Sequence, residues 1–200
     1  PLLMEIKGLH VAIVHRRFAL GGAEEVSRQT ACLFSDLGIH THFFAETHIE
    51  TEWTLPDDPL IDLSLLPQGM RLWTKESALY LVRAFKERGV KVLIIPIALR
   101  NDYLPLIRAA GIKIIYWCHS SPLWELVDGR ERASYKAHHP WYKNLYSLTL
   151  RRLRLALSSA EKLRTRYRDL VWQVDCFITL TPEYVQEFVS ALGLNDDEAS

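Results

Sequence analysis

Short apolar runs alternate with amphipathic stretches along most of the chain, and this alternation predicts strands separated by helices. The apolar runs predict strands over Val11–His15, Ile39–Ala45, Leu60–Leu66, Lys91–Ile97, Ile112–Cys118 and Cys176–Leu180. The amphipathic stretches predict helices over Ala23–Leu37, Trp73–Arg88, Asp102–Ala110 and from Pro182 to a stop at Gly193, with Thr181 as the cap of the last one. This order implies right-handed crossovers and a mostly parallel sheet. We therefore expect an α/β fold, Rossmann-like, in three αβα layers.

A long amphipathic helix is predicted before the last strand. Apolar residues recur at steps of three or four from Tyr146 to Val174, which would make a helix about 45 Å long if it were continuous. Its segment 151–168 holds seven cations and one acid, Glu161, a local net charge of +6. Two interpretations stay open: the segment is attracted to an anionic membrane surface, or it is a solvated basic face whose apolar side packs on the domain.

Composition narrows the class of protein. The 200 residues suit one domain, taken here as residues 1–194, with residues 195–200 as a tail or linker. Apolar residues make up 48% of the chain, enough for a core, and 24 basic residues balance 24 acidic ones, which disfavours a general nucleic-acid binder. Three cysteines without CxxC spacing argue against disulfides or zinc and fit a cytoplasmic location. Neither a signal peptide nor a membrane span is predicted.

The first candidate for chemistry is the glycine pair that opens the first helix. Backbone N–H groups at Gly21 and Gly22 would approach an anion closely, and the helix dipole adds partial positive charge there, so a phosphate or a sugar hydroxyl fits. The alternative is a tight loop that needs positive φ. The spacing is not GxGxxG, which weakens a dinucleotide interpretation. Glu24 and Glu25 in the first helical turn are interpreted as complements of the dipole.

Other candidates follow the predicted strands, because ligands gather at the carboxyl ends of strands in open α/β sheets. His119 comes directly after one strand, and Ser120 follows it. Arg16 and Arg17 are placed in the loop after the first strand, where they face an anionic acceptor or a donor diphosphate, or are simply solvated. Asn101 contacts acceptor hydroxyls or, with Asp102, caps the next helix.

Four pieces of the chain occur in an order that resembles a known family. They are the helix start Gly21-Gly22-Ala23-Glu24, the turn Leu37-Gly38-Ile39-His40-Thr41, the strand that ends in His119, and Val174–Glu183. Together they resemble the N-terminal half of a retaining glycosyltransferase of the GT-B type, family 4. The resemblance covers nearly the whole chain. It departs from the family where Ser120, rather than an acid, follows His119.

The resemblance implies two Rossmann-like domains that face each other across a cleft. This chain would be the acceptor-binding half of a nucleotide-sugar-dependent hexosyltransferase in glycan or glycolipid biosynthesis, and the missing C-terminal domain would hold the donor. Similar enzymes use the glycines at Gly21 and Gly22 to contact the donor, and a histidine at the place of His119 lies by the reacting sugar. The resemblance implies no metal and no cofactor, with the nucleotide sugar as substrate. The chain alone would be inactive.

The expected partners are a sugar or lipid-linked sugar acceptor and the absent domain of the same chain, with peripheral contact at the inner face of a membrane and no nucleic acid. Arg16, Arg17, Asn101 and Ser120 are the candidate acceptor residues, Gly21 and Gly22 the donor residues, and His119 the catalytic one. Two other hypotheses compete. One is a non-catalytic α/β binding module, and the other is a membrane- or nucleic-acid-binding module that uses residues 151–168.

Overall fold

The structure is a computed structural model that describes residues 6–96, 102–119, 138, 140–151, 153 and 160–194. The chain divides into two compact units, which we describe separately. The first comprises Pro1–His119 and Leu170–Ile178, and the second comprises Ser120–Asp169 and Thr179–Ser200. Asn101 and Ser120 therefore lie outside the described residues, as does the predicted tail.

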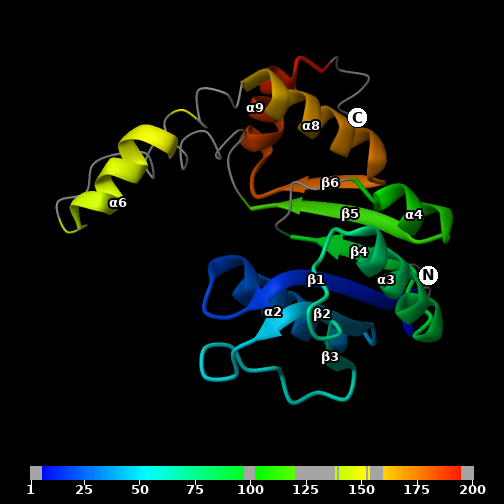
Figure 1. Ribbon diagram of the computed structural model, residues 1–200. Coiled ribbons are helices and arrows are strands. Elements are labelled where there is room, and N and C mark those ends of the chain that lie inside the picture. Colours follow the sequence, from blue (N-terminus) through cyan, green and yellow to red (C-terminus); the bar gives the residue numbers. More distant parts are fainter. Residues whose placement is uncertain are drawn as a thin grey trace. The chain divides into compact units, whose positions relative to one another are not determined.

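A six-stranded sheet organises the first unit, and Figure 1 shows its strands side by side. The strand order is β3-β2-β1-β4-β5-β6. The strands are β1 (His10–Phe18), β2 (His40–His48), β3 (Ile61–Leu65), β4 (Val92–Ile95), β5 (Lys113–Cys118) and β6 (Cys176–Thr179). The pairs β1–β2, β1–β4, β2–β3 and β4–β5 are all parallel. The order, with two sets of strands running outward from β1, confirms the predicted α/β Rossmann-like fold.

Helices cover both faces of this sheet, and the alternation of side chains along the strands shows how. The helices of the first unit are α2 (Gly22–Asp36), α3 (Lys75–Glu87) and α4 (Leu104–Ala109). Phe43 is buried in a core cluster with Ala31 of α2. The next residue, Phe44, points to the other face, where its ring meets Phe85 of α3 edge-on at 5.2 Å. The sheet is thus buried on both sides, as a parallel sheet requires.

Strand β1 is longer than predicted, because its end is buried by residues distant in the sequence. Phe18 is fully buried and pairs with His48 of β2. Its ring lies 4.4 Å from that of Trp53 and 5.1 Å from that of Phe43. Consequently Arg16 and Arg17 lie within the strand and not in the loop where the sequence placed them.

Two helix starts also differ from the prediction. Helix α3 begins at Lys75 and not at Trp73, because Thr74 and Ser77 form a capping box in which each side chain accepts from the other's backbone N–H. Trp73 itself has φ 63°, outside helical geometry. The N-cap of α4 is Tyr103, without a side-chain hydrogen bond, so capping of this helix by Asn101 or Asp102 was a wrong prediction.

The second unit contains α6 (Trp141–Tyr146), a π-helical turn η1 (Ser147–Arg151) and α9 (Pro182–Leu192), while α8 (Ala160–Gln173) begins in it and ends in the first unit. A single helix starting at Tyr146 was a wrong prediction, since Tyr146 ends α6. The π turn shifts the helical phase, which periodicity alone does not reveal. Thr181 caps α9 through Tyr184 N and left-handed Gly193 ends it, as predicted. Within this unit the rings of Tyr167 and Phe188 pack at 5.4 Å.

Candidate functional site

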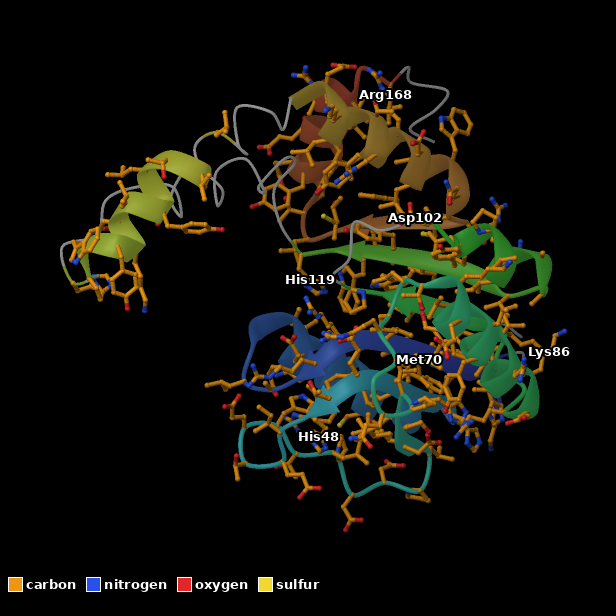
Figure 2. All side chains as sticks on the ribbon, viewed as in Figure 1. His48, Met70, Lys86, Asp102, His119 and Arg168 are labelled. Carbon is orange, nitrogen blue, oxygen red and sulfur yellow. The ribbon has the colours of Figure 1, made fainter. Side chains whose placement is uncertain are left out.

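A histidine of β1 and a histidine that directly follows β5 lie at the carboxyl edge of the sheet. Ile13 of β1 pairs with Ile94 of β4, and Ile94 pairs with Ile115 of β5, so these three residues form one row. Two residues further along β1 comes His15, and β5 continues on the same face through Trp117. His119 follows β5, and Figure 2 shows it at the carboxyl end of that strand. Both histidines therefore lie at the carboxyl edge of the sheet, where ligands of open α/β sheets bind.

His15 is the buried centre of this group. Its side chain is fully buried, and its Nε2 lies 2.8 Å from Ser27 Oγ of α2. Its Nδ1 lies 3.7 Å from Glu24 Oε1 and has no hydrogen-bond partner among the described residues. Burial lowers the pKa of His15, and the nearby Glu24 carboxylate offsets this only in part. His15 is therefore a neutral imidazole near pH 7.

Glu24 carries the negative charge of the site. Its pKa lies below the ordinary value because the His15 side chain stabilises the carboxylate; the backbone N–H of Glu24 also lowers it, while partial burial opposes the shift. Its main chain is held as well, since Trp53 Nε1 donates to the Glu24 carbonyl oxygen at 3.2 Å. An ionised carboxylate thus sits at the N-terminus of α2, where the helix dipole favours it.

The two glycines have different roles in this geometry. Gly21 is the N-cap of α2 in an extended conformation, φ −171° and ψ 153°, which any residue adopts. A Cβ added to Gly21 would collide with the Glu24 carboxylate, whereas one added to Gly22 would meet nothing within 4 Å. Neither glycine has positive φ, so the alternative of a strained tight loop was wrong. Gly21 makes room for Glu24, and Gly22 leaves the first turn of α2 open.

His119 belongs to the same neighbourhood. Its ring packs on Trp117 at 4.7 Å, and its buried Nε2 has no hydrogen-bond partner among the described residues. Burial and then the charge of His15 lower the pKa of His119, while the charge of Glu24 raises it. A neutral imidazole with one unused nitrogen can donate or accept one hydrogen bond. Together with the carboxylate and the open helix start, it suits a ligand rich in hydroxyl groups.

The candidate arginines follow His15 on β1 and have carboxylate partners of their own. The side chains of Arg16 and Arg17 are 74% and 55% exposed, so both remain accessible. Arg16 Nε lies 3.4 Å from Glu46 Oε2, and Arg17 lies 3.8 Å from Glu52. Glu46 is itself fixed by the backbone N–H of Leu72 at 2.7 Å. These surface pairs contribute little to stability, and they leave the arginines able to turn toward an anion.

His15 and Ser27 were missed by the sequence analysis, and Glu24 was taken as a dipole complement only. The available signal was the alternation of β1, which puts His15 on the same face as Val11 and Ile13. No group of three His, Cys, Asp or Glu among the described residues could hold a metal ion. Within the same residues no helix is long and apolar enough to cross a bilayer.

Comparisons with known proteins add little to the assignment. No protein-family model and no curated protein matches the chain. Among solved structures, the chain is similar to UGT2 of Phytolacca americana complexed with UDP-2fluoro-glucose and pterostilbene, with 14% sequence identity and a TM-score of 0.42. The match covers 66% of this chain and 36% of that chain, so this chain spans only about a third of that protein. A likeness at this level carries no argument about function, and the fold assignment rests on the strand order and register.

Proposed function

We propose that the chain is the acceptor-side half of a nucleotide-sugar-dependent, retaining glycosyltransferase of the GT-B type, family 4. One observation supports the proposal: His15 with Glu24, at β1 and the start of α2, and His119, directly after β5, lie at the carboxyl edge of a parallel sheet, where Gly22 leaves the helix start open. The ordered family pieces in the sequence support it independently. In the whole protein we expect hexosyl transfer in glycan or glycolipid biosynthesis.

The charges of the site suit sugar transfer with retention. Such transfer passes through an oxocarbenium-like state, which gains positive charge at the anomeric carbon. A neutral His119 donates a hydrogen bond to a sugar hydroxyl without adding a repulsive positive charge. The ionised Glu24 adds negative potential nearby. The backbone N–H groups of Gly21 and Gly22 are assigned to the donor, and Arg16 and Arg17 are assigned to an anionic acceptor or the donor diphosphate.

The remaining parts of the proposal concern residues and partners beyond the described site. Asn101 and Ser120 stay assigned to acceptor hydroxyls. The donor nucleotide sugar is a substrate and would be held by a C-terminal domain, and neither metal nor cofactor is needed. The acceptor is a sugar or a lipid-linked sugar, and the protein acts in the cytoplasm, at the inner face of a membrane where the acceptor is lipid-linked. This chain alone would not transfer sugar.

The test is transfer by the longest natural protein that carries this chain, measured against a panel of nucleotide sugars. His119→Ala should lower kcat about 100-fold, the loss typical for one preorganised hydrogen-bonding group. His138→Ala is the matched control, since His138 is exposed and belongs to the second unit, and it should keep full turnover. Full turnover by the His119 variant, or a natural protein without a second Rossmann-like domain, would contradict the proposal.

A further inference from the structure

The carboxylate of Glu24 folds back over the residue that caps its own helix. Gly21 is the N-cap of α2, and Glu24 belongs to the first turn. A Cβ on Gly21 would collide with Glu24 Oε2, so this oxygen lies directly against the N-cap. The His15 side chain, and then the backbone N–H of Glu24, lower the pKa of the carboxylate against partial burial, so it is ionised near pH 7. The chain itself thus supplies the negative charge that a helix start attracts.

A buried imidazole faces the inner side of this carboxylate. His15 Nδ1 lies 3.7 Å from Glu24 Oε1, and His15 Nε2 lies 2.8 Å from Ser27 Oγ. An N–H that faces a carboxylate is attracted to it, whereas a nitrogen lone pair is repelled, so the proton of the neutral ring belongs on Nδ1. The Ser27 hydroxyl then donates to Nε2. These two contacts hold the ring, and the ring holds the carboxylate.

The pair of His15 and Glu24 keeps hydrogen-bonding capacity in reserve. The buried Nδ1 is unpaired within the part of the chain that the structure describes, because 3.7 Å is too long for a hydrogen bond. Contacts of this length in binding sites commonly tighten when the ligand is in place. The His15 side chain is fully enclosed, whereas 17% of the Glu24 side chain is exposed. An incoming group therefore meets the carboxylate and not the imidazole.

The chemistry of that exposed carboxylate selects the ligand. An ionised carboxylate only accepts hydrogen bonds, so it suits a group that donates one, such as a hydroxyl. A phosphate group has no such proton to offer when fully ionised, and its negative charge is repelled by the carboxylate. Without Glu24 the same helix start would be an ordinary anion site.

We propose that Glu24 accepts a hydrogen bond from a hydroxyl group of a neutral sugar and closes the start of α2 to phosphate groups. His15 and Ser27 are positioning residues for its carboxylate. This inference rests on the proposed function, in which a sugar is the substrate, and it narrows that function. The backbone N–H groups of Gly21 and Gly22 would serve the sugar part of the donor and not its diphosphate.

The neighbouring Glu25 provides a matched control. Its carboxylate accepts from Arg28 Nη2 at 2.6 Å and from Gln29 Nε2 at 3.0 Å, and these bonds lower its pKa to about 2. Glu25 therefore carries the same charge in the same helical turn, but its partners belong to its own helix. Glu24→Gln and Glu25→Gln remove equal charge from the first turn of α2, so a difference between them reports the position of the Glu24 carboxylate.

The experiment measures binding by NMR in the longest natural protein that carries this chain, with isotope-labelled glycine and histidine. The probes are inorganic pyrophosphate and, separately, glucose, galactose, mannose and N-acetylglucosamine. Gly22→Ala assigns the Gly22 amide signal, since a Cβ there meets open space. At least one monosaccharide should shift this signal, and pyrophosphate should not.

The variants should then separate the two parts of the proposal. Glu24→Gln should weaken monosaccharide binding about tenfold and let pyrophosphate shift the Gly22 signal, because a charge-assisted hydrogen bond and a like-charge repulsion are both lost. Glu25→Gln should change the monosaccharide affinity less than about twofold and leave pyrophosphate without effect. The nitrogen shifts of His15, assigned with His15→Gln, should show the proton on Nδ1. Circular dichroism establishes that each variant is folded.

Several results would overturn the proposal. They are a Gly22 signal that pyrophosphate shifts in the unmodified protein, no shift with any monosaccharide, or equal effects of Glu24→Gln and Glu25→Gln. A proton on Nε2 of His15 would refute the positioning role. Because these measurements involve no sugar transfer, absence of transfer with the expected shifts would refute only the glycosyltransferase function. Transfer without the expected shifts would refute only the role of Glu24.

Discussion

His10 and His42 share a hydrogen bond of 2.8 Å between Nδ1 of the first ring and Nε2 of the second. The other nitrogen of His42 lies 2.6 Å from Asp62 Oδ2, and the His10 ring stacks on His40 at 4.3 Å. These residues join β1, β2 and β3 near their amino ends, away from the candidate site. A hydrogen bond between two imidazoles needs one nitrogen without a proton, so the chain of bonds breaks when both rings become cationic.

This cluster predicts a loss of stability in mild acid. The pKa of His10 lies below 6.5 because of burial and of His40 and His42, with Asp62 opposing them in part. The unfolded chain therefore binds more protons than the folded one as the pH falls below about 6.5, and the free energy of unfolding decreases there. His10→Gln should make the difference in urea stability between pH 7.5 and pH 5.5 smaller. Thr165→Ala, which removes no titratable group, should leave that difference unchanged, and an equal effect of both variants would contradict the assignment.

The close approach of the Glu24 carboxylate to Gly21 predicts that the effect of Gly21→Ala on stability depends on whether the Glu24 side chain is present. Gly21→Ala forces the Glu24 carboxylate away from His15, so it should destabilise the protein even though φ at this position suits alanine. In a Glu24→Ala background the same change should be nearly neutral. Urea unfolding of the four proteins should give a coupling energy of at least about 0.5 kcal/mol, as for side chains in contact. Gly22→Ala, with open space around its Cβ, should show no such coupling.

The buried bond between His15 and Ser27 predicts a substantial stability cost. Ser27→Ala leaves His15 Nε2 buried without a partner, which should lower the free energy of unfolding by about 1–3 kcal/mol. Thr165→Ala removes a helical hydroxyl whose bond to the Glu161 carbonyl is exposed, and should cost less than about 0.5 kcal/mol. Chemical denaturation measures both. Equal costs would mean that the His15–Ser27 bond is not formed.

The contacts of Asp175 predict that its hydrogen bond to the backbone contributes more to the free energy of unfolding than its surface ion pair does. Its Oδ2 accepts from the backbone N–H of Ile114 at 2.9 Å, and its backbone N–H donates to the Ile114 carbonyl at 2.8 Å. Its Oδ1 pairs with Lys113 Nζ at 2.9 Å, but the Lys113 side chain is 71% exposed. Asp175→Ala should therefore cost about 1–2 kcal/mol, and Lys113→Ala no more than about 0.5 kcal/mol, in thermal or urea unfolding. The reverse ranking would show that the ion pair dominates.

The sequence was sufficient for the sheet and for most helices of the first unit. Runs of β-branched residues marked the buried strands, and glycines with positive φ ended the helices: Gly38, Gly89 and Gly111 have φ of 73°, 69° and 80°. The end of β1 was not predictable, because Phe18 is buried by Trp53. The start of α6 and the π turn were missed because exposed leucines imitate the spacing of a packed helix.

The site was predictable only where strand ends and glycines mark it. His119 and Gly22 follow from the rule that ligands bind at the carboxyl edge, and both lie there. His15 and Ser27 did not follow, because a buried histidine is recognisable only from the partner that satisfies it, here 12 positions away. The proposed roles of Asn101 and Ser120 stay predictions.

Trp53 connects the segment between β2 and β3 to the end of β1 and to the first turn of α2. Its indole ring packs on Phe18 at the end of β1, and its Nε1 donates a hydrogen bond to the main-chain carbonyl of Glu24. A replacement of Trp53 would therefore also remove a hydrogen bond from the first turn of α2. A graft that replaces this segment should therefore keep Trp53 in place.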